Sequence, residues 1–69
     1  MKYAVVIEKG PKNYGAYVPD LLGCVATGKT PAIVRERIEQ AIAAHVASLR
    51  EHGEPVPKPT TIAAYASVA

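Results

Sequence analysis

The sequence lacks most of the devices that small proteins use to stabilise a fold. It contains no tryptophan or phenylalanine, and Cys24 is its only cysteine, so no disulfide can form within the chain. The soft metal ligands are Cys24, His45 and His52, and no two of them have the close spacing of a zinc-finger pair. A chain of 69 residues buries only about 60% of its unfolded surface. We therefore expect a single domain over residues 1–69, without metal or cofactor, that is stabilised by self-association.

Long apolar runs and a strong charge imbalance are also missing. No stretch approaches the roughly 20 apolar residues that span a bilayer, and Glu8 follows the N-terminus too closely for a secretory signal. One unpaired cysteine and no export signal favour the cytoplasm. The net charge is +2, and its basic residues are scattered, which is a weak case for a nucleic-acid-binding face.

One segment is typical of a long helix. Thr30 can cap its N-terminus, Pro31 suits the first helical position, and Gly53 is placed to end it. Between them one stripe recurs at helical spacing: Val34, Ile38, Ala41, Ile42, His45, Leu49 and His52. A helix with a single apolar stripe needs one partner surface, which the flanking segments must supply as a sheet.

Strands are predicted over Lys2–Lys9, Tyr14–Val18 and Cys24–Gly28. After the helix, alternating prolines predict a stiff, extended return, and Thr60–Val68 is consistent with a last strand or a frayed tail. The expected fold is α+β with the order β-β-β-α-β. Three antiparallel strands are followed by one parallel strand, and the helix lies on one face. We expect the strand order 3-2-1-4, because the first strand is apolar on both sides and therefore suits the centre.

Catalytic machinery is not expected. Cys24 and His45 are the one possible thiol and base, but a packed cysteine and a core or oligomer-contact histidine explain them better. The carboxylates do not converge on one metal site: they are Glu8, Asp20, Glu36, Glu39, Glu51 and Glu54. The aromatic residues are Tyr3, Tyr14, Tyr17 and Tyr65, which are more typical of a core or a protein interface than of base stacking. A nucleic-acid-binding module that uses these tyrosines with Lys2, Lys9 and Lys12 stays open as the alternative.

The run Tyr14–Thr30, which reads YGAYVPDLLGCVATGKT, resembles a segment of HicB-like antitoxins. The likeness extends to the strand Tyr3–Glu8, to Ala41, Ile42 and His45, and to the exit Gly53–Pro59, which reads GEPVPKP. It thus covers about residues 3–59. The resemblance implies a partial RNase H-like fold without that enzyme's acidic site. It also implies a homodimer or homotetramer that neutralises a HicA-like, mRNA-cleaving toxin by covering its active site.

Two features depart from the family pattern. Leu22 stands where the family usually has proline, and the helix begins with Pro31-Ala32-Ile33-Val34 where acidic residues are more common. Many members carry a C-terminal DNA-binding domain, for which the 69 residues leave no room, so direct DNA binding is not expected. The candidate partner-binding residues are Tyr17, Asp20, Leu21, Leu22 and Cys24. His45 and Tyr65 are the candidates for an oligomer or core contact.

Overall fold

The long helix organises the molecule as predicted. The computed structural model describes all 69 residues and places α1 at Pro31–Glu51. The backbone N–H of Ile33 donates to the Thr30 hydroxyl at 3.1 Å, which satisfies one of the free donors at the helix start. Beyond the helix end, Gly53 adopts a φ of +69°, a left-handed conformation that glycine accepts without steric cost. The predicted cap and stop signals are therefore confirmed.

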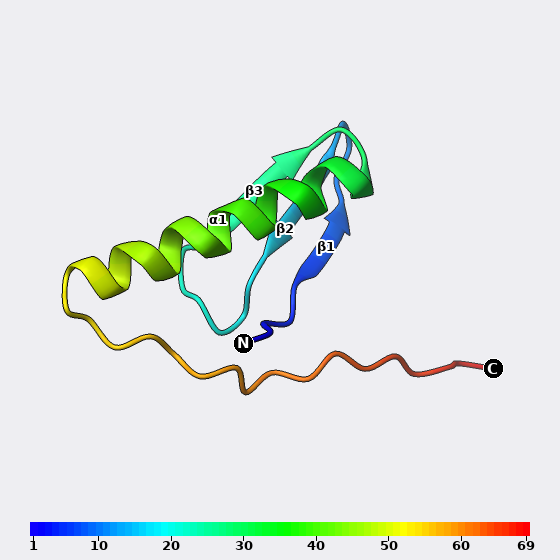
Figure 1. Ribbon diagram of the computed structural model, residues 1–69. Coiled ribbons are helices and arrows are strands. Elements are labelled where there is room, and N and C mark those ends of the chain that lie inside the picture. Colours follow the sequence, from blue (N-terminus) through cyan, green and yellow to red (C-terminus); the bar gives the residue numbers. More distant parts are fainter.

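Three short strands form the sheet against which α1 packs (Figure 1). They are β1 at Val6–Lys9, β2 at Tyr14–Tyr17 and β3 at Val25–Gly28, all antiparallel and in the order β1-β2-β3. Each strand is shorter than the sequence pattern predicted, because Pro19 and the loop residues after it leave the ladder early. The α+β class, the order of these elements and the helix on one face are confirmed.

The predicted fourth strand is not present. Thr60–Val68 is extended but belongs to no strand, so β1 lies at an edge of the sheet and not at its centre as predicted (Figure 1). The alanine-rich sequence of this segment gives a weak strand propensity and few large side chains to bury. The proline-rich return does behave as expected: Val56 packs against the core, and the Tyr3 hydroxyl donates to the Pro57 carbonyl.

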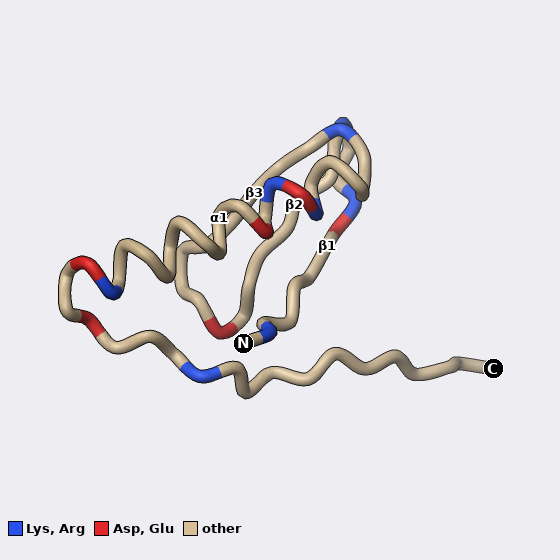
Figure 2. The backbone as a smooth tube through the Cα atoms, in the orientation of Figure 1, with Lys and Arg blue, Asp and Glu red and all other residues tan.

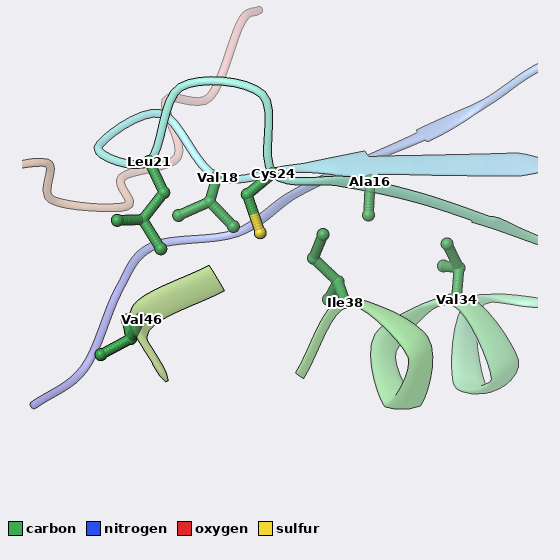
Figure 3. Close-up of a cluster of buried hydrophobic side chains, with 7 residues drawn as sticks. All are labelled: Ala16, Val18, Leu21, Cys24, Val34, Ile38 and Val46. Atoms are coloured by element: carbon green, nitrogen blue, oxygen red, sulfur yellow. The ribbon is translucent and has the colours of Figure 1, made fainter. Parts of the chain in front are cut away.

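A small apolar core lies between the sheet and the helix (Figure 3). Its buried members are Ala16, Val18, Leu21, Cys24, Val34, Ile38 and Val46. The helical stripe was predicted correctly in its first half, but Val46 takes the buried position in the second half and His45 is only half-buried. Figure 3 places Val46 near Leu21, so this part of α1 faces the loop after β2, beyond the end of the sheet.

Helix and sheet come close together at Gly28, the last residue of β3. A Cβ atom at this position would lie 2.9 Å from the backbone nitrogen of Val34 and 3.0 Å from Cγ2 of Ile33. Backbone atoms cannot move aside as a flexible side chain can. The contact therefore requires glycine for its small size, although Gly28 has no positive φ.

Gly28→Ala should destabilise the fold by about 1–3 kcal/mol, because the added methyl must push α1 away from the sheet. Chemical denaturation followed by circular dichroism measures this change in the free energy of unfolding. Gly15→Ala is the matched control: it lies in β2, and the nearest atom to its added Cβ would be 4.0 Å away. Equal stability of the two variants would show that the close approach does not constrain the packing.

Candidate protein-binding surface

The loop between β2 and β3 is a compact turn held by its own backbone. The N–H of Leu21 donates to the Val18 carbonyl at 3.1 Å, and the N–H of Cys24 donates to the Leu21 carbonyl at 3.1 Å. Gly23 supplies the positive φ, +80°, that this return requires. The geometry turns neighbouring leucines in opposite directions: Leu21 is 1% exposed and Leu22 is 96% exposed.

The sheet face opposite α1 carries a row of apolar side chains. Val6 pairs with Tyr17, and Tyr17 pairs with Val25, so the three residues lie side by side across all three strands. Val6 is half-buried, whereas Tyr17 is 42% and Val25 66% exposed. This row and, separately, the exposed Leu22 in the loop that joins β2 to β3 are together called the candidate binding surface. Exposed apolar side chains gathered on one face indicate a place where another protein binds.

This surface includes only part of the predicted partner-binding set. Tyr17 and Leu22 are exposed as a contact residue must be. Leu21 and Cys24 point into the core, so they anchor the loop to the core and are not accessible to a partner (Figure 3). Val6 and Val25 could not be predicted from the sequence, because their alignment with Tyr17 depends on strand register. The one signal in the sequence was the alternating pattern of the first strand, which indicates the face on which Val6 lies.

Asp20, the remaining candidate, binds the C-terminal segment. Its carboxylate accepts hydrogen bonds from the backbone N–H groups of Thr60 and Thr61, both at 3.0 Å, and from both threonine hydroxyls at 2.9 Å. These bonds, above all that from the Thr61 N–H, favour the charged form and lower the pKa of Asp20 from 3.8 to about 2. Asp20 therefore connects the loop to a segment 40 residues further along the chain.

The Asp20 attachment should depend on pH in acid only. Its folded pKa lies below the unfolded value, so the stabilisation is fully present above about pH 4 and is lost as the pH falls through about 2. An NMR titration should show the Thr60 and Thr61 amide resonances moving together with the Asp20 carboxyl carbon. Asp20→Ala should abolish that titration and speed amide exchange at both threonines at neutral pH. A carboxyl pKa near 4 would contradict the four-bond arrangement.

The remaining candidates differ in exposure. His45 is half-buried on α1, and Tyr65 is fully exposed, so Tyr65 is not a core residue in this chain. Cys24 is 4% exposed, and burial raises the pKa of its thiol above the ordinary value. A buried thiol with a raised pKa is a poor nucleophile, which supports the packing role predicted for Cys24.

Cys24 should therefore resist thiol reagents in the folded protein. A chromogenic disulfide reagent at pH 8 should label it at least tenfold more slowly than it labels the denatured chain, because reaction requires an exposed thiolate. Leu22→Cys in a Cys24→Ser background provides an exposed control in the same loop. Rapid labelling of native Cys24 would exclude a purely structural role.

Many of the basic backbone positions gather at one end of the molecule, near the β1–β2 turn and the start of α1, with acidic positions among them (Figure 2). No group of three or more histidine, cysteine or acidic side chains lies together in a metal-binding arrangement. The tyrosines are also divided, since Tyr3 and Tyr14 pack against the core and Tyr65 lies on the C-terminal segment. They do not make the common stacking surface that the nucleic-acid alternative requires.

No helix of the structure combines the length and the apolar character needed to cross a membrane.

The comparisons with known proteins agree with this architecture. Residues 3–68 match the family described as the HicB-like antitoxin of bacterial toxin–antitoxin systems. The chain therefore belongs to the HicB-like antitoxin family. It is 41% identical over 59 residues to the UPF0150 protein Ta0767 of Thermoplasma acidophilum, a match that covers 84% of this chain and 86% of that protein.

Two further relatives extend the comparison. An uncharacterised 14.9 kDa protein from the rep–hol intergenic region of Haemophilus phage HP1 is 34% identical over 65 residues. That match covers 94% of this chain but 49% of the phage protein, so the chain spans about half of that relative's length. Among solved structures, a chain of the HicA3 and HicB3 toxin–antitoxin complex superposes with a TM-score of 0.74 at 33% identity. The superposition covers 87% of this chain and 70% of the other.

Proposed function

We propose that this protein is an antitoxin that binds and neutralises a HicA-like, mRNA-cleaving toxin in the cytoplasm. The observation that carries the proposal is the structural match to a chain of a HicA3–HicB3 complex, at 33% identity and a TM-score of 0.74. Membership of the HicB-like family over residues 3–68 supports it independently of the structure. The protein acts by contact and carries out no reaction of its own.

The contact is made by the candidate binding surface, with Leu22 and Tyr17 as its main side chains. Leu22 is almost fully exposed on a loop whose backbone bonds and buried Leu21 hold it in place. Because the loop backbone is already held in place, covering Leu22 costs little backbone conformational entropy, and burial of its apolar surface adds to affinity. Tyr17 adds the large, rigid contact area that is typical of protein interfaces.

Charge has a smaller part in this recognition. The first turn of α1 contains no acidic residue, and the net charge of the chain is +2. A basic toxin would gain little long-range attraction from such a surface. We therefore expect affinity that changes little with salt, as befits apolar contact.

Co-expression of this protein with a HicA-like toxin should restore growth of cells that the toxin arrests, and the two proteins should co-purify. Leu22→Asp should weaken the complex at least tenfold in a titration by calorimetry, because it places a charge in the apolar contact. Tyr17→Ala should weaken it to a similar extent.

Ala43→Asp, an equally drastic change at an exposed position of α1, is the matched control and should leave the affinity unchanged. Failure of the unaltered protein to bind the toxin or to restore growth would refute the antitoxin role. If both surface variants bound the toxin with unchanged affinity, the proposed contact surface would be wrong, and the antitoxin role would stand.

A further inference from the structure

The loop between β2 and β3 ends in a tight turn over Leu21–Cys24. The N–H of Cys24 donates to the Leu21 carbonyl at 3.1 Å, which is the bond that closes a four-residue turn. Gly23 has a φ of +80°, whereas no residue other than glycine has a positive φ in this chain. A positive φ at the third position alone is the mark of a type II turn. Leu22 therefore occupies the second position of a type II turn.

Proline is the residue that this turn position favours. Its ring fixes φ near −65°, which the second position of a type II turn requires, and it restricts the unfolded chain. Proline would also remove no hydrogen bond, because the backbone N–H of Leu22 donates none. The backbone of the turn therefore does not explain why leucine stands here.

Packing within the chain does not explain the leucine either. The side chain of Leu22 is 96% exposed, whereas Leu21 and Cys24 at the two ends of the turn are 1% and 4% exposed. These two neighbours point into the core and hold the turn in place (Figure 3). A residue that serves neither the turn nor the core is explained by what it contacts outside the chain.

Leu22 also has no large free side chain beside it. Gly23 has none, Leu21 is buried, and the Asp20 carboxylate is bound to Thr60 and Thr61. A single protruding side chain can be enclosed by a partner on all sides, whereas a flat surface would cover only part of it. Side chains that fill a desolvated pocket contribute most of the affinity in protein interfaces.

We propose that Leu22 is the selectivity residue of the toxin contact and enters a closed apolar pocket on the HicA-like toxin. The inference rests on the proposed function, since it concerns the same partner. Leucine gives up the restriction that proline would place on the turn, and it extends an apolar side chain away from the backbone. A proline ring closes onto its own backbone nitrogen and cannot reach as far.

Leu22→Pro should raise the melting temperature of the isolated protein by about 2–6 °C, because proline suits the turn and restricts the unfolded chain. Leu22→Ala, which leaves φ unrestricted, should not produce this rise. Thermal unfolding followed by circular dichroism measures both variants. A melting temperature that Leu22→Pro lowers or leaves unchanged would show that the turn itself requires leucine, and the proposal would be overturned.

Calorimetric titration with a HicA-like toxin measures the contact. Leu22→Pro and Leu22→Ala should each weaken binding at least tenfold, because burial of a leucine side chain contributes that much or more. Leu22→Met has a similar volume and a flexible side chain, so its affinity should stay within about threefold. Leu22→Phe should also weaken binding at least tenfold, because a closed pocket that fits leucine excludes a larger ring.

Three outcomes of the titration would contradict the inference in different ways. Unchanged affinity of Leu22→Pro and Leu22→Ala would show that Leu22 does not select the partner, although the antitoxin role would stand. Tight binding by Leu22→Phe would show a flat apolar contact in place of a closed pocket. Failure of the unaltered protein to bind the toxin would overturn the proposed function together with this inference.

Discussion

The packing of α1 onto one face of a three-stranded sheet is the interaction on which the rest of this structure depends. Seven buried apolar side chains form the core between the two layers, and none is aromatic. With so little apolar area, the layers must lie close, and the absent side chain of Gly28 permits this where β3 meets the start of α1. Loss of a single contact in such a core removes a large share of the total stability.

One helix can cover only one face of a sheet, so the opposite face of the sheet stays accessible. The opposite face keeps the row Val6–Tyr17–Val25 accessible, and the loop after β2 adds Leu22. Because the sheet has only three strands in the order β1-β2-β3, the outer edge of β1 has no neighbouring strand. The chain belongs to the HicB-like antitoxin family, whose members form part of bacterial toxin–antitoxin systems.

Asp20 connects these parts of the molecule. It lies in the loop beside the exposed Leu22, yet its carboxylate is fully engaged with Thr60 and Thr61. A charged acceptor with four donors is a stronger attachment than the apolar contacts of an alanine-rich segment could provide. The position of the C-terminal segment is therefore set by a polar interaction at one point and not by packing along its length.

The sequence alone was sufficient to predict the helix, its caps, the three antiparallel strands and the family. These depend on local signals, such as Thr30 with Pro31, Gly53 and the alternation within each strand, which act over a few residues. The tertiary structure decided what depends on distant partners: the burial of Leu21 and Cys24 and the register that aligns Val6, Tyr17 and Val25. It also placed β1 at an edge, because a strand becomes central only when a second neighbour pairs with it. Residues 60–68 have too weak a strand propensity to provide that neighbour from within the chain.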